Sequence, residues 1–130
     1  MEAQNRLEWS LFLLRVGVFI VMAAWTLDKF LNPAHAVVVF ENFYLLPELQ
    51  FTTMYIIGAV QAVFVLAFMA GYKKRISYGA ILLMHTFSTF SSFERYLQMD
   101  MLFFAAWPML SACVALYALR DLDKKYTVEK

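Results

Sequence analysis

The chain has 130 residues, of which 62% are hydrophobic, 18% aromatic and only 16% charged. A soluble domain of this length cannot hide so much apolar surface, because small domains bury only part of what their chains expose. The composition therefore predicts a membrane protein. The formal net charge of +1 excludes the basic patch or stripe of a nucleic-acid binder. The single cysteine, Cys113, excludes an intrachain disulfide and a paired-cysteine metal site.

Four stretches of the chain have the length and apolar character of a transmembrane helix, which needs roughly 20 such residues. They cover about residues 9–31, 51–71, 76–97 and 101–119, with charged residues between them. The first stretch is too long for the core of a signal peptide, so it is expected to remain in the protein. Pro108 is expected to kink the last one. The pattern predicts an all-α fold: an integral membrane four-helix bundle formed by one domain over residues 1–130.

A shorter helix is predicted between the first and second spans, over about residues 33–44. Asn32 can cap it, and Pro33 occupies the first helical position, where proline costs least. We expect this helix to lie at, or dip into, the outer leaflet. Its polar residues His35 and Glu41, together with Tyr44, are expected to form an outer docking surface with the aromatic residues beside them.

The distribution of lysine and arginine predicts the orientation, because these residues concentrate in cytoplasmic loops. The outer side carries only Lys29 and Arg95. Both termini and the loop between the second and third spans are therefore expected to face the cytoplasm. The basic residues on that side are Arg6, Lys73, Lys74, Arg75, Arg120, Lys124, Lys125 and Lys130.

Polar residues inside spans are expensive, and each is a candidate for function. Helix rise places several of these residues, which come from four different spans, at comparable depth. Three of them, His85, Ser88 and Thr89, share one face of the third span with Ser92. They predict a pocket for a lipid headgroup or a quinone ring, with His85 as its hydrogen-bond partner or as a proton carrier. The alternative is that the serine and threonine hydroxyls only pack and bond neighbouring helices. The pocket candidates are Arg15, Gln61, His85, Ser88, Thr89 and Ser111.

Arg15 has two interpretations of its own. It lies about two turns from the cytoplasmic end of its span, so its side chain can extend to the headgroups. It can instead point inward, to a carboxylate or a ligand. Glu8, one heptad earlier, is the nearby carboxylate, and this favours the extended arrangement slightly.

Charged pairs mark the outer ends of the first and third spans. These are Asp28 with Lys29, and Glu94 with Arg95. Reciprocal ion pairs between them are expected to tie the two helices together, which is a structural role.

Metal and catalytic chemistry find little support in the sequence. Met99, Asp100 and Met101 with His35 give a weak signal for copper, and His35 and Glu41 lie on nearly opposite sides of their helix. The two histidines are roughly 15 Å or more apart by helix rise, which excludes a bis-histidine haem and leaves a single axial histidine open. No nucleophile–base pair or phosphate loop is found. We therefore predict no metal site and no catalytic residue.

Two segments of the first span resemble the DoxX-like family of four-helix bacterial membrane proteins, to which the MauE-type proteins are related. They are Leu13-Leu14-Arg15-Val16-Gly17 and the run from Trp25 to Pro33; the short helix and the second span with Gly58 also fit. The resemblance implies a role at a quinone-linked or redox complex in the bacterial inner membrane. Family members include a small subunit of a thiosulfate:quinone oxidoreductase and maturation factors of redox enzymes. They share no single reaction, and this chain lacks the paired cysteines that a disulfide-handling role needs.

Three functions are compatible with these features. The first is an accessory or structural subunit that binds membrane lipid, another membrane protein or a second copy, and possibly a quinone. The second is a small quinone-reactive oxidoreductase with His85 and Arg15 near the ring. The third is a small-molecule transporter, which requires an oligomer because four spans are few for one chain.

Overall fold

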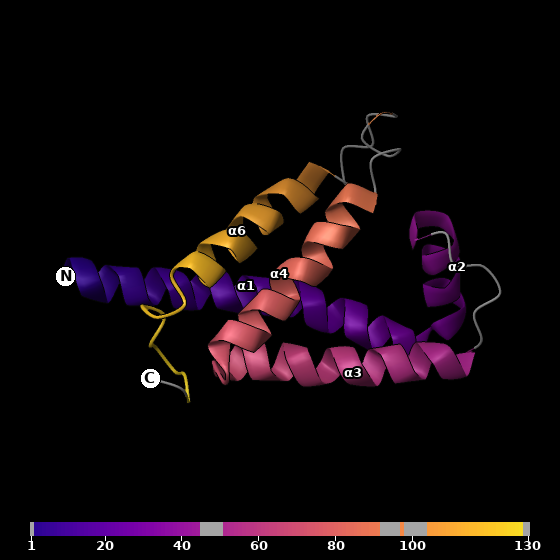
Figure 1. The fold of residues 1–130 in the computed structure, drawn as a ribbon, viewed down its shortest axis with the longest axis horizontal. Coiled ribbons are helices and arrows are strands. Elements are labelled where there is room, and N and C mark those ends of the chain that lie inside the picture. The colour runs from indigo at the N-terminus through magenta and orange to yellow at the C-terminus, as the bar shows by residue number, and fades with distance from the viewer. Residues whose placement is uncertain (1, 45–50, 92–96, 98–103, 129–130) are drawn as a thin grey trace.

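The computed structural model describes residues 2–44, 51–91, 97 and 104–128, and within these residues it contains five helices and no strand. The prediction of an all-α fold is confirmed for this part of the chain. The helices are α1 (Ala3–Leu31), α2 (Pro33–Tyr44), α3 (Phe51–Ala70), α4 (Lys74–Ser91) and α6 (Ala106–Ala118) (Figure 1).

The four longer helices form two antiparallel pairs. α1 packs along α3, and α4 packs along α6, while α2 contacts the ends of α1 and α3. The two pairs approach one another at the end of the molecule that holds the N-terminus, the α3–α4 turn and the C-terminal segment, and they diverge toward the opposite end (Figure 1).

The helix boundaries agree with the predicted spans at several points and differ at others. α1 begins at Ala3, six residues earlier than expected, and α3 ends within one residue of the prediction. α4 runs from Lys74 to Ser91, and residues 92–96 lie outside the described part. α6 begins at Ala106, so Pro108 lies in its first turn instead of the interior of a longer span. Proline has no N–H group, but the N–H groups of the first turn have no partner within the helix, so Pro108 breaks no intrahelical hydrogen bond.

The junction between α1 and α2 forms as the sequence predicts. The N–H of Asn32 donates to the Asp28 carbonyl at 2.8 Å and closes α1. The residue before a proline disfavours helical backbone, which explains why α1 ends here. The side-chain Oδ1 of Asn32 then accepts the N–H of His35 at 3.4 Å, so it caps α2.

The reversal between α3 and α4 depends on Gly71. Its φ of +67° is in the left-handed region that glycine tolerates best. Its N–H donates to the Phe68 carbonyl at 3.1 Å, and the N–H of Tyr72 donates to the Ala67 carbonyl at 2.9 Å, which is the pattern of a Schellman helix end. This turn brings the first residues of α4 beside the C-terminal segment.

The interior of the bundle is unusually polar, and its surface is unusually apolar. Buried positions on α1 and α4 follow helical spacing, but about half of the buried side chains in the described residues are polar or charged. α1 and α3 are long and apolar enough to cross a membrane, yet only 28% of either apolar stretch is buried. The buried polar residues are Arg15, Thr26, Lys29, Gln61, Lys74, Ser77, His85, Thr89, Asp123 and Thr127.

Candidate functional site

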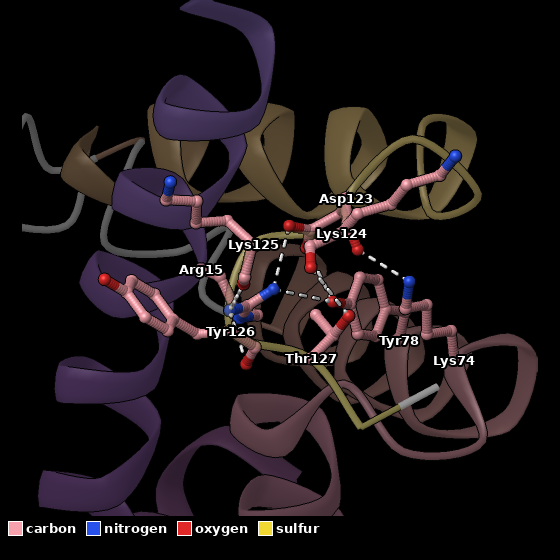
Figure 2. A network of polar contacts seen from close by, with 8 residues as sticks. All are labelled: Arg15, Lys74, Tyr78, Asp123, Lys124, Lys125, Tyr126 and Thr127. Carbon is pink, nitrogen blue, oxygen red and sulfur yellow. Dashed lines mark hydrogen bonds and ion pairs between the residues drawn. The ribbon is translucent and has the colours of Figure 1, made fainter. Parts of the chain in front are cut away.

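Arg15 of α1 lies fully inside the bundle, with 0% of its surface exposed. One guanidinium nitrogen, Nη1, donates to Oδ1 of Asp123 at 2.8 Å and to the hydroxyl of Tyr78 at 3.4 Å. The other, Nη2, donates to the carbonyl oxygens of Lys125 and Tyr126 at 2.6 and 3.3 Å (Figure 2). The charge is therefore compensated by one carboxylate and three neutral oxygens.

Asp123 is the centre of this arrangement and is also fully buried. Its Oδ2 accepts the Tyr78 hydroxyl at 2.6 Å, and its backbone carbonyl accepts Nζ of Lys74 at 2.6 Å (Figure 2). A buried ion pair is tolerated when further hydrogen bonds satisfy the remaining atoms. Here they satisfy both Nη atoms of the guanidinium and both carboxylate oxygens, while Nε of Arg15 has no hydrogen-bond partner among the described residues. We call Arg15, Lys74, Tyr78 and Asp123 the Arg15 cluster; it joins α1, α4 and the C-terminal segment.

The C-terminal segment, residues 120–128, folds back across the bundle, and we call it the C-terminal strap. Near its end the N–H of Val128 donates to the carbonyl of Ala70 at 2.9 Å. The ring of Tyr126 meets Phe12 and Trp9 edge to face, with centroids 5.1 and 6.4 Å apart. The strap therefore contacts both helix pairs and covers the Arg15 cluster.

These contacts correct the preferred interpretation of Arg15. Its side chain points inward and does not extend toward headgroups, and its carboxylate partner is Asp123, not Glu8. The sequence carries part of the signal, because Asp121 and Asp123 follow the last predicted span. It did not indicate that the strap folds back or which aspartate is buried.

A second feature is a cavity of about 560 Å³ between α1, α4 and α6. Its walls are mostly aliphatic and include Leu13, Val18 and Met109, and Gly17 leaves one wall open. Its polar contributions come from His85, Ser88 and the indole of Trp25; its lining residues on α6 and just before it are Ala105, Ala106, Pro108, Met109 and Ala112. We call this the His85 cavity.

His85 has one satisfied and one unsatisfied ring nitrogen. Nε2 lies 2.9 Å from the carbonyl oxygen of Ala106. A carbonyl only accepts, so Nε2 carries the hydrogen, and in the uncharged ring Nδ1 is left as an acceptor. Nδ1 is buried and has no hydrogen-bond partner among the described residues. The ring stacks on Trp25 with centroids 5.9 Å apart and 28° between the planes.

The predicted polar face of α4 is present only in part at the cavity. Ser88 lines the cavity beside His85. Thr89 is buried, and its hydroxyl donates to the His85 carbonyl within α4 at 2.7 Å. Ser92 lies outside the described residues.

The four helices predicted to converge on one pocket do not bring Arg15, Gln61, His85 and Ser111 to the His85 cavity. Gln61 is buried on α3 and does not line the cavity, and Ser111 is exposed on α6. Arg15 belongs to the separate cluster at the converging end of the bundle. Of these four residues, His85 alone lines the cavity.

The charged residues at the far end of α1 have a different described partner from the predicted one. Nδ1 of His35 lies 2.7 Å from Oδ2 of Asp28, with 57% and 33% of the two side chains exposed. Such an exposed pair contributes little to stability. Lys29 is buried on α1. The predicted partners Glu94 and Arg95 lie outside the described residues.

The predicted outer docking surface and copper signal are only partly covered by the described residues. Glu41 is exposed on α2, whereas the side chain of Tyr44 and the residues Met99, Asp100 and Met101 are outside the description. Within the described part of the chain, no three His, Cys, Asp or Glu residues gather as a metal site would need.

The molecule thus has two distinct buried polar features. The Arg15 cluster is enclosed and held by mutual hydrogen bonds, whereas the His85 cavity is apolar and open enough to hold a small molecule. Comparison of the chain with protein-family models, curated proteins and solved structures gives no match.

Proposed function

We propose that this chain is a four-helix integral membrane protein that holds a lipid or quinone in the His85 cavity, as an accessory subunit of a redox or quinone-linked complex. The observation that carries the proposal is the cavity itself. Its volume of about 560 Å³ falls within the roughly 300–1,000 Å³ of small-molecule sites. Aliphatic walls suit an apolar body, and a few polar groups fix the orientation of a bound molecule.

The distribution of apolar side chains supports the membrane part of the proposal. Large apolar residues are exposed along the helices, with Leu13 64%, Val63 66% and Leu83 72% exposed. Water would make this surface costly, whereas lipid tails would cover it. A polar interior fits as well, because membrane helices associate through packing and hydrogen bonds, not through burial of apolar surface. In this proposal α4 and α6 complete a bundle of four spans.

The arrangement of the ends supports a bundle with both termini in the cytoplasm. The N-terminus, the α3–α4 turn and the C-terminal strap lie at one end of the molecule (Figure 1). These segments carry most of the lysine and arginine residues, which concentrate on the cytoplasmic side. α2 then lies at the outer face of the bacterial inner membrane.

The accessory role rests on the resemblance to the DoxX-like family. Several residues that carry the resemblance surround the two features described above. Leu13, Leu14, Gly17 and Trp25 line the His85 cavity, and Arg15 anchors the C-terminal strap. That these residues surround one cavity supports a ligand-holding scaffold that serves a partner enzyme.

Native mass spectrometry of the protein, extracted in mild detergent from its own host, tests the proposal. We expect a bound apolar mass of lipid or quinone size and an assembly with a second polypeptide. In Gly17→Leu the bound mass should disappear, because a Cβ at Gly17 meets no atom within 4 Å and the longer side chain can enter the cavity. The matched control is Ala59→Leu, at an exposed position of α3 that does not line the cavity.

Two results would contradict parts of the proposal. A wild-type protein without any bound apolar mass, or a Gly17→Leu variant that keeps it, would remove the cavity as the binding site. A ligand-loaded chain that never associates with another polypeptide would remove the accessory role. That second result would favour a protein that acts on its ligand alone.

A further inference from the structure

The hydrogen-bonding state of His85 limits the kind of molecule that the cavity can hold. Nε2 is used as a donor to the Ala106 carbonyl at 2.9 Å. The remaining polar atom of the ring is the Nδ1 acceptor, which is buried in an apolar setting without a partner among the described residues. A buried acceptor is stabilised only by a donor. A ligand that brings an O–H or N–H group can therefore satisfy Nδ1.

Quinones and quinols differ in this respect. A quinone carries carbonyl oxygens that only accept hydrogen bonds, so it leaves Nδ1 unsatisfied. A quinol, a phenol or an alcohol has a hydroxyl that can donate to Nδ1. Sites that leave a polar group unpaired with the wrong ligand discriminate against that ligand strongly.

We infer that the His85 cavity selects an apolar molecule with a hydroxyl donor, such as a quinol, in preference to the corresponding quinone or ether. This inference rests on the proposed function and narrows its ligand from a lipid or quinone to a molecule with a hydroxyl group, which is a hydroxyl lipid or the reduced form of the quinone. The hydroxyl donates to Nδ1 of His85, while the apolar body lies along the aliphatic wall between Leu13 and Met109.

Access to Nδ1 requires movement of a neighbouring side chain, and Trp25 reports on binding. Nδ1 is covered by protein atoms, so a neighbouring side chain must shift before a ligand can reach it. Trp25 lines the cavity, stacks on the His85 ring and is still 41% exposed. Its indole can therefore move without leaving a packed core, and its fluorescence should change when the cavity is filled.

The experiment uses the full chain in mild detergent with Trp9→Phe and Trp107→Phe, which leaves Trp25 as its one tryptophan. The probes are 4-nonylphenol and its methyl ether, 4-nonylanisole, which differ only in the donor. We expect the phenol to bind with a Kd roughly tenfold lower than the ether, the size expected for one well-placed hydrogen bond. A second pair, 1-decanol and decyl methyl ether, separates the two natural sources: a preference limited to the phenol assigns quinols, and an equal preference in both pairs assigns hydroxyl lipids.

Two conservative variants locate the acceptor. The amide of glutamine reaches the position of Nε2, so His85→Gln keeps the donor to Ala106 and loses the acceptor. The amide of asparagine reaches the position of Nδ1, so His85→Asn can supply an acceptor there. We expect the preference for the phenol to fall to about onefold in His85→Gln and to persist in His85→Asn.

The outcomes separate this inference from the proposed function. If phenol and ether bind equally well and Gly17→Leu blocks both, the cavity binds apolar molecules but the hydroxyl selection is wrong. If neither probe changes Trp25 fluorescence, or Gly17→Leu has no effect, the cavity proposal itself fails. If His85→Gln does not fold, the comparison of phenol and ether binding to the protein with His85 unchanged still tests the selection for a hydroxyl group.

Discussion

The Arg15 cluster and the His85 cavity place polar side chains from the same two helices, α1 and α4, in opposite situations. In the cluster, four oxygens surround one guanidinium, and the carboxylate at its centre is bonded on both oxygens. In the cavity, a single imidazole has one partner and an open, apolar neighbourhood. The cluster is held by matched polar groups, with Nε of Arg15 as the exception, whereas Nδ1 of His85 is unmatched in a residue that lines a cavity.

The arrangement of the helix pairs explains this difference. Tyr78 of the cluster precedes His85 by seven residues on α4, which is about 10 Å along the helix axis. Over this distance the pairs diverge (Figure 1), and the C-terminal strap fills only the converging end. α1 and α4 therefore contribute to an enclosed cluster at the converging end and to a cavity farther along the two helices.

The largest effect is expected for Asp123→Asn. This change leaves the fully buried Arg15 without a negative charge, and breaking a buried ion pair costs about 3–5 kcal/mol. Thermal unfolding in mild detergent should show the loss, while the exposed neighbour change Asp121→Asn should be nearly neutral. The double variant Arg15→Leu with Asp123→Leu should recover much of the stability. Equal unfolding midpoints for Asp123→Asn and Asp121→Asn would show that the ion pair does not stabilise the fold.

A smaller loss is expected for Tyr78→Phe. Its hydroxyl donates to Asp123 at 2.6 Å, and hydrogen bonds to charged groups contribute about 1.5–3 kcal/mol. The control is Tyr72→Phe, at a residue that is 52% exposed. A denaturation midpoint that falls as much in the control as in Tyr78→Phe would show that the hydroxyl is not part of the anchor.

Gly71→Ala tests whether the turn holds the C-terminal strap. A non-glycine residue at a φ of +67° is strained by about 1–3 kcal/mol, and an added Cβ would collide with the side chain of Thr127. We expect the strap to detach more often, so trypsin should cleave faster after Lys124. The control, Gly79→Ala, lies inside α4 and meets Tyr117 at 3.3 Å. If trypsin cleaves both variants at the wild-type rate, Gly71 does not control the strap.

The smallest effect on stability is expected for Gly17→Leu, at the cavity. Leucine is more favourable than glycine inside a helix by up to about 1 kcal/mol, and the added side chain enters open space. The unfolding midpoint should stay constant or rise slightly, although the bound molecule is lost. A clear fall in stability would mean that the space beside Gly17 is not available to a side chain.

The sequence predicts those parts of the fold that depend on local signals. Asn32 followed by Pro33 ends one helix and begins the next, and the long apolar runs form helices. The C-terminal strap has no such signal, because its position depends on Asp123 meeting a residue 108 positions earlier. The sequence of the strap has no hydrophobic periodicity that indicates this contact.

For a similar reason, the sequence predicts only the part of the candidate site that depends on spacing within one helix. His85 and Ser88 share a helix face, so their common position at the cavity follows from their spacing. Gln61 and Ser111 were selected by depth alone. The rotation of a helix about its axis is set by packing against its neighbours, and this placed Gln61 away from the cavity and Ser111 on the surface.

The span of 108 residues between Arg15 and Asp123 has a consequence for biosynthesis. Ribosomes add roughly 5–20 residues per second, so the arginine is made about 5–20 s before its carboxylate. In the membrane bundle proposed above, the first helix must wait through that interval with an uncompensated charge. A nascent chain interrupted before Asp123 would keep this charge permanently, and membrane proteases that recognise unstable helices could then distinguish it from a finished one.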